Sequence, residues 1–122
     1  MSVEQAKILV VIVIITLISG VGDSLGFIHA AQMWHNGKIV WHEFSKSALG
    51  FMVGIGSYWL SVKYLREFGV FSPEAQTLIW FGATIVGVAV VSRKFFAWQA
   101  IDQAIGIAVF LGISWLMFRT GG

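Results

Sequence analysis

The sequence predicts an all-α fold: a bundle of four transmembrane helices that forms one domain over residues 1–122. Only 11% of the residues are charged, 57% are hydrophobic, and the mean hydropathy is +0.83. A soluble protein normally carries about a quarter charged residues, so this composition suits lipid rather than water. Four apolar segments with short connections fill nearly the whole chain. We therefore expect a multi-pass membrane protein, and we place it in the cytoplasmic membrane of a prokaryote.

The first two spans are expected at residues 4–33 and 41–66. The first has an apolar body at residues 8–18, followed by a more polar half that contains Asp23. Asn36-Gly37 is a dipeptide typical of tight turns, and we expect it to separate the two spans. Gly69 is the expected stop of the second span.

The third and fourth spans are expected at residues 72–91 and 98–118. Ser72-Pro73-Glu74 is a helix start, with a capping serine, a proline at the first helical position and an acid near the positive end of the helix dipole. Arg93 and Lys94 mark the membrane interface before the fourth span. Most of the six tryptophans lie near predicted span ends, as interfacial aromatic residues do, which leaves Trp59 and Trp80 as pocket or core residues.

Small residues recur every four positions on three of the predicted helices. Such stripes let helix backbones approach closely in lipid, so each one predicts a packing face. The stripes are Gly22, Gly26 and Ala30 on the first helix, Gly50 and Gly54 on the second, and Ala100, Ala104, Ala108 and Gly112 on the fourth. The fourth helix has the most regular stripe and is the best candidate for a contact between chains. Lysine and arginine divide four to four between the two sides, so they predict no orientation and leave insertion in both directions open.

Asp23 is the deepest acid in the predicted membrane region. A charged side chain at the centre of a membrane helix costs roughly 2.5 to 3.5 kcal/mol on insertion scales. Asp23 must therefore face a protein partner, face a water-filled cavity, or be protonated. Two interpretations stay open: a carboxylate that binds a proton or cation, and an acid bonded to a serine, Gln103 or Lys46 of a neighbouring helix.

Other polar residues map to the same half of the membrane as Asp23, near the first and third connections. Clustered acids, bases and amides can hydrate and pair one another, so this one-sidedness predicts a polar vestibule. The residues to which we assign ligand binding are Asp23, Ser24, His29, Glu43, Lys46, Asp102 and Gln103.

Simpler roles are available for several of these residues. Glu43 and Lys46, three positions apart on one helix face, are expected to form an intrahelical ion pair. Asp102 can complement the dipole of the fourth helix. His29 and His42 lie close enough in depth for haem held by two helices, but histidines at an interface are common and no standard zinc spacing occurs. We therefore assign no cofactor and no metal.

The plan of four short helices, with an acid in the first and small residues in the last, resembles that of the small multidrug resistance transporters. Those proteins carry a glutamate in the middle of an apolar first helix. Here the acid is an aspartate, later in the helix and with polar neighbours, so no residue role is carried over.

The leading functional hypothesis is a homo-oligomeric transporter or channel for a small molecule or ion that uses the intramembrane carboxylate. The alternative is a non-catalytic accessory or anchor subunit of a larger membrane complex. We do not expect an enzyme, because the chain has no room for a soluble domain. Its eight lysines and arginines form no cluster, so nucleic-acid binding is not expected either. The expected partners are the lipid bilayer and either copies of the chain or a larger complex.

Overall fold

A computed structural model describes residues 1–120, apart from the side chains of residues 113, 116–118 and 120. Four α-helices make up most of this range: α1 (Val3–Ala30), α2 (Trp41–Phe68), α3 (Pro73–Ser92) and α4 (Ala100–Thr120). Two short strands, β1 (Trp34–His35) and β2 (Lys38–Ile39), join α1 to α2, and a 3-10 turn, η1 (Phe95–Ala97), precedes α4. The predicted all-α fold class is confirmed.

The connection between α1 and α2 is a β-hairpin. Trp34 pairs with Ile39 and His35 with Lys38 in antiparallel register. Asn36 and Gly37 both have positive φ angles, 50° and 74°, which is the backbone of the tight turns that close such hairpins. The turn prediction at Asn36-Gly37 is confirmed. α1 ends at Ala30 rather than at the expected residue 33, because residues 31–33 form turns that lead into the hairpin, where the carbonyl oxygen of Met33 accepts a hydrogen bond from the amide of Val40.

The other helix ends follow their local signals closely. α2 begins at Trp41, as predicted, and is closed by Gly69, whose φ of 108° suits a residue without a side chain. Ser72 caps α3 by accepting a hydrogen bond from the amide of Ala75, with Pro73 at the first helical position. α4 begins two residues later than expected, at Ala100, because Trp98, which ends the 3-10 turn η1, has an extended backbone.

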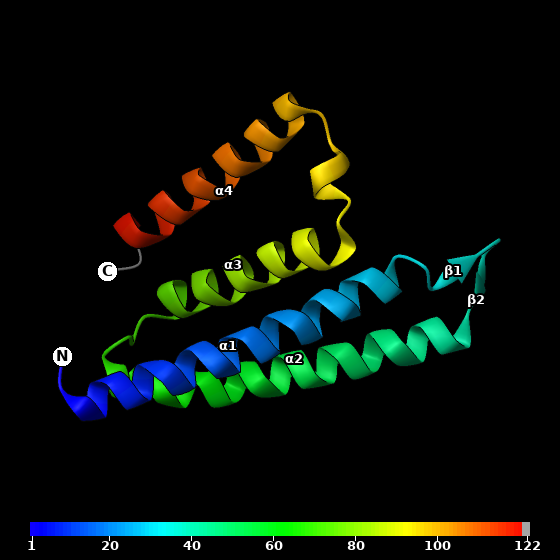
Figure 1. The fold of residues 1–122 in the computed structure, drawn as a ribbon. Helices are drawn as coiled ribbons and strands as arrows, with labels where there is room; N and C mark the ends of the chain where they lie inside the picture. Colours follow the sequence, from blue (N-terminus) through cyan, green and yellow to red (C-terminus); the bar gives the residue numbers. More distant parts are fainter. Residues whose placement is uncertain (121–122) are drawn as a thin grey trace.

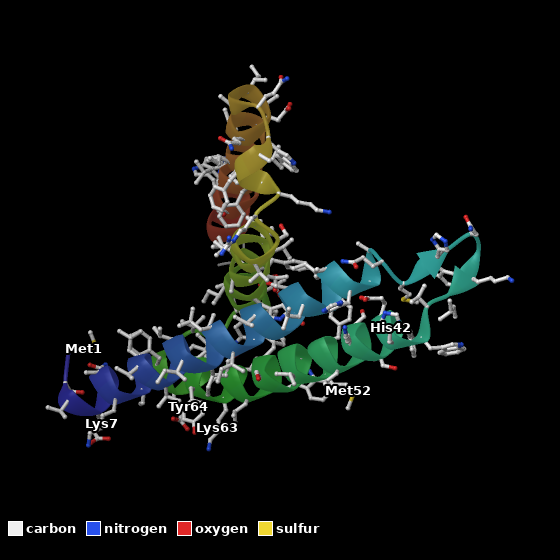
Figure 2. The ribbon with its side chains drawn as sticks, turned by 45° about the vertical axis from the view of Figure 1, so that its right-hand side comes forward. Met1, Lys7, His42, Met52, Lys63 and Tyr64 are labelled. Carbon is white, nitrogen blue, oxygen red and sulfur yellow. The ribbon has the colours of Figure 1, made fainter. Side chains whose placement is uncertain are left out.

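The helices alternate in direction (Figure 1). α1 and α2 run antiparallel and side by side, α3 packs mainly against α1, and α4 lies on the far side of α3. α4 therefore ends on the side of the molecule where α1 begins. Figure 2 shows α3 and α4 rising from one side of the α1–α2 pair. The three helices α1, α2 and α3 form the packed part of the molecule, and α4 meets α3 through Phe110, which packs over Gly82.

The contact between α1 and α2 is formed by glycines of both helices. A β-carbon on Gly22 would lie 2.8 Å from the backbone nitrogen of Gly54, and one on Gly50 would lie 2.7 Å from the carbonyl oxygen of Gly22. The stripes predicted on the first two helices are thus packing faces within one chain. The stripe on α4 is different, because all four of its residues are exposed in this chain: Ala100, Ala104, Ala108 and Gly112.

The surface of the molecule is apolar. Among the side chains that the structure describes, only Ile12, Leu65 and Leu78 are buried hydrophobic residues, whereas most large hydrophobic side chains are exposed. α1 and α3 are long and apolar enough to cross a membrane, and only 33% and 17% of their most apolar stretches are buried. The core helix of a soluble protein would bury most of such a stretch, so these two helices fit a lipid environment. α2 is less apolar than α1 and α3 and is not among the helices apolar enough to cross a membrane, so four membrane spans remain a proposal.

Candidate functional site

Asp23 lies at the centre of the three packed helices. Its side chain is completely buried, with 0% exposure. The carboxyl group fills the space left by Gly54 of α2, where a β-carbon would collide with Oδ1. On the α3 side, the Thr84 hydroxyl donates a long hydrogen bond of 3.5 Å to Oδ2. Oδ1 has no hydrogen-bond partner among the described residues, which is an unusual state for a buried carboxyl oxygen.

A polar stripe on α3 faces this carboxyl group. Gln76, Trp80 and Thr84 follow one another at intervals of four residues and therefore share one face of the helix. The indole ring of Trp80 lies next to Asp23, but its Nε1–H group is outside hydrogen-bonding geometry and is also buried without a partner in residues 1–120. A buried donor and a buried acceptor thus stand beside each other.

Serine hydroxyls surround Asp23 and bond backbone carbonyls. Ser19, one turn before Asp23, donates to the carbonyl oxygen of Gly54 across the α1–α2 seam at 2.7 Å. Ser24 donates to the carbonyl oxygen of Gly20 within α1. Ser47 joins α2 to the carbonyl oxygen of Gly26 at 2.7 Å. Ser24 also makes a longer contact of 3.5 Å to the carbonyl oxygen of Thr84 on α3, so each of the three hydroxyls joins two helices. None of the three donates to Asp23.

A small cavity adjoins the site on the side of the α1 N-terminus. Its volume is about 10 Å³, close to the roughly 10–15 Å³ needed for one water molecule. Trp80 contributes to its wall together with hydroxyl and amide side chains of all three packed helices. Those polar residues are Thr16, Ser19, Tyr58, Ser61 and Gln76. Polar side chains between α1, α2 and α3 therefore lie on both sides of Asp23 rather than on one side only.

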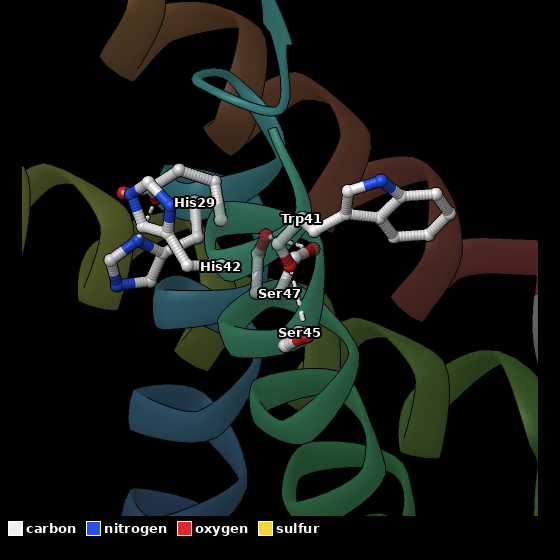
Figure 3. A network of polar contacts seen from close by, with 7 residues as sticks. His29, Trp41, His42, Ser45 and Ser47 are labelled. Atoms are coloured by element: carbon white, nitrogen blue, oxygen red, sulfur yellow. Dashed lines mark hydrogen bonds and ion pairs between the residues drawn. The ribbon is translucent and has the colours of Figure 1, made fainter. Parts of the chain in front are cut away.

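A second polar cluster ties the ends of α1 and α2 together beside the hairpin. His29 Nδ1 lies 2.5 Å from Glu43 Oε2, and His42 Nε2 lies 3.4 Å from Glu43 Oε1. Figure 3 shows the two histidines together on one side of α2, with the Trp41 ring on the other. The Glu43 side chain is only 12% exposed, so the His29 contact is partly shielded from solvent.

The expected ion pair between Glu43 and Lys46 is wrong. The Glu43 carboxylate turns to the two histidines instead, because His29 of α1 is brought within reach by the hairpin. Among residues 1–120, Lys46 makes no hydrogen bond and no ion pair within 4.0 Å. The suggested bonds from Asp23 to a serine, to Gln103 or to Lys46 are not found either, since Thr84 and Trp80 occupy that side of the carboxyl group.

The structure places the seven predicted site residues in three separate locations. Asp23 and Ser24 are buried in the core. His29, Glu43 and Lys46 lie near the hairpin. Asp102 and Gln103 are on α4, where Asp102 is exposed and the Gln103 amide donates to the carbonyl oxygen of Phe95 at 3.0 Å. A single vestibule containing all seven is not formed in this chain.

The sequence interpretation missed the partners of Asp23 on α3. Thr84 was not considered, and Trp80 was named only as a pocket or core residue. The available signal was the spacing of Gln76, Trp80 and Thr84, which places these three residues on one helix face. Trp59, the other tryptophan singled out, is 71% exposed.

Comparison with protein-family models, with curated proteins and with solved structures finds no match to this chain.

In the part of the chain that the structure describes, no three histidine, aspartate or glutamate side chains are grouped to hold a metal ion. His29 and His42 share the Glu43 carboxylate as their partner. The site must therefore be interpreted from its own chemistry.

Proposed function

We propose that this chain is a small membrane transport protein in which Asp23 binds and releases a proton or a small cation. The observation that carries the proposal is the state of the carboxyl group: it is completely buried, and Oδ1 has no hydrogen-bond partner in the described residues. An ionisable residue placed at membrane depth is costly and is usually retained for function. A carboxyl group with an unused oxygen is suited to exchange a proton or to bind a cation.

The polar interior supplies a route to and from Asp23. Among the described side chains, the buried polar residues outnumber the three buried hydrophobic ones: Ser19, Asp23, Ser24, Ser47, Ser61, Gln76 and Thr84. Hydroxyl groups that donate to a carbonyl oxygen keep their own lone pairs free to accept. The water-sized cavity beside Trp80 lies on this route. A line of such groups between packed helices is a reasonable path for a proton.

We propose four membrane spans, α1 to α4. α1 and α3 already have the required length and apolarity. In α2, the sixteen residues between Lys46 and Lys63 carry no charge, and lysines at both ends can extend their side chains towards the headgroups. α4 exposes a series of large apolar side chains that suit lipid, among them Ile101, Ile105 and Val109. Each helix then crosses the bilayer in the direction opposite to its neighbour in sequence.

We further propose that the protein works as a homo-oligomer that assembles through α4. The small-residue stripe on this helix has no partner of its own chain in the described structure, and Gly112 has open space around it. Stripes of this kind allow close helix contacts in lipid.

The same exposed helix favours a second candidate, an accessory or anchor subunit of a larger membrane complex. In that case α4 packs against a different protein, and Asp23 is a structural group. Purification of the chain alone in detergent separates the two: a defined homo-oligomer supports the transport protein, and a monomer that assembles only with other proteins supports the subunit.

A flux assay tests the transport proposal directly. The purified chain is reconstituted into lipid vesicles that contain a pH-sensitive dye, and a potassium diffusion potential is imposed with valinomycin. A rate of proton entry well above that of protein-free vesicles is expected. Repeating the assay with sodium or lithium gradients identifies the transported ion, and background rates for every ion would overturn the proposal.

A further inference from the structure

A long groove runs along the seam between α1 and α2, away from the Asp23 site. Its volume is about 550 Å³, within the range of about 300–1,000 Å³ typical of small-molecule sites. All the residues that line it belong to α1 and α2, so neither α3 nor α4 covers it. The glycines Gly22 and Gly50 form its floor, because the absence of side chains there leaves a furrow between the two helices.

The walls of the groove are apolar and regular. Leu17, Val21 and Leu25 follow one another at intervals of four residues along α1, and Leu49 and Val53 face them from α2. These side chains stand on both sides of the furrow and are each well exposed, between 38% and 63%. Such a furrow accepts an extended apolar chain.

One end of the groove carries a cation. Lys46 and His29 line that end. His29 is bonded to Glu43, which does not line the groove. Lys46 is exposed and, among the described residues, makes no ion pair within 4.0 Å, although it lies close enough to Glu43 for a longer-range electrostatic attraction. The ammonium group of Lys46 is therefore the charge that the groove offers to an occupant.

The length and position of the groove match one leaflet of a bilayer. From His29 to Leu17 along α1 is twelve residues, or about 18 Å at 1.5 Å per residue. Half of a hydrocarbon core of about 30 Å is about 15 Å. Lys46 lies about one and a half helical turns from Trp41, which is exposed beside the hairpin as tryptophans at the headgroup level are.

We propose that this groove binds an anionic phospholipid, with one acyl chain between the leucine and valine walls and the phosphate at Lys46. Charge and length together select this occupant: the groove is apolar along one leaflet and cationic only at the headgroup end. The proposal requires the chain to lie in a bilayer, but it does not depend on transport by Asp23.

Native mass spectrometry of the detergent-purified chain tests the proposal. Phosphatidylglycerol and phosphatidylcholine with the same acyl chains are titrated separately, and the affinity of the first bound lipid is compared. Phosphatidylglycerol is expected to bind about fivefold more tightly, which corresponds to the roughly 1 kcal/mol of one lysine near an anionic headgroup. Lys46→Gln should remove this preference. Leu49→Trp, which fills the groove, should weaken both lipids.

Lys63→Gln is the matched control, because Lys63 is an exposed lysine at the opposite end of α2 and does not line the groove. It should keep the wild-type preference. Equal affinities of the two lipids for wild type, or a preference that survives Lys46→Gln, would overturn the proposal. A lipid-free dimer that Leu49→Trp converts to monomers would also overturn it, because a second copy of the chain would then occupy the groove. None of these readouts depends on ion flux.

Discussion

Asp23 of α1 and Gly54 of α2 are in direct contact, with the carboxyl group occupying the space that a β-carbon on Gly54 would need. The glycine therefore does two things at once. It lets the two helix backbones approach, and it makes room for a buried acid between them.

Gly54→Ala should destabilise the protein. The added methyl group overlaps both the Asp23 carboxyl group and the backbone nitrogen of Asp23, so α1 and α2 must move apart. Forcing extra atoms into a packed contact typically costs about 1–3 kcal/mol. A thermal or denaturant melt in detergent measures the change.

Gly56→Ala is the matched control, two residues away on the same helix. A β-carbon on Gly56 meets nothing within 4 Å. Alanine is the better helix former by about 1 kcal/mol, so this variant should be neutral or slightly more stable than wild type. If the two variants melt alike, the close contact at Gly54 is not as described.

Ser47→Ala should cost about 0.6 kcal/mol, the average value for a hydrogen bond between membrane helices. The Ser47 hydroxyl joins α2 to the carbonyl oxygen of Gly26 on α1 at 2.7 Å. Ser45 bonds only the carbonyl oxygen of Trp41 in its own helix, so Ser45→Ala should leave the melt almost unchanged. A larger effect of Ser45→Ala than of Ser47→Ala would contradict this assignment.

The Glu43 cluster should hold the hairpin end closed, mainly through His29. The His29 contact is short, at 2.5 Å, and its ring is 24% exposed, whereas the His42 contact is 3.4 Å and its ring is 70% exposed. In hydrogen-exchange mass spectrometry, His29→Gln should therefore speed exchange in residues 31–40 more than His42→Gln does. The reverse order would mean that His42 is the main partner.

The sequence was sufficient for most helix ends because these depend on local chemistry. Asn36-Gly37, Gly69 and Ser72-Pro73 each act on their own backbone, and all three behave as predicted. The partner of Glu43 was predicted wrongly because it depends on which residue the hairpin brings across from α1. Lys46 is close in sequence, but His29, fourteen positions away, is the residue in contact.

The surroundings of Asp23 were harder to predict for the same reason. Its depth and its glycine-rich neighbourhood could be recognised from residues 19–33 alone. The choice of Thr84 and Trp80 as neighbours depends on which face of α3 packs against α1, and sequence spacing gives the polar face but not its partner. The hydroxyls that extend the polar interior towards Gln76 come from three helices, so no single stretch reveals them.

Ala104→Leu should weaken the proposed self-association through α4. Ala104 is at the centre of the exposed small-residue stripe, and a larger side chain would keep two such helices apart. Size-exclusion chromatography with light scattering in detergent gives the oligomeric state. Ile107→Val, a conservative change at an exposed position outside the stripe, should leave it unchanged. An Ala104→Leu protein with the wild-type mass would rule out this face.

The most direct measurement is ion flux through vesicles that contain Asp23→Asn. The amide has nearly the same shape as the carboxyl group and costs less to bury than a charge, so the variant should fold and melt like wild type. It cannot release a proton or bind a cation by charge, so flux should fall to the level of protein-free vesicles. Glu67→Gln, the same change at an exposed acid at the end of α2, should keep wild-type flux. Wild-type flux in folded Asp23→Asn protein would contradict the central role of Asp23.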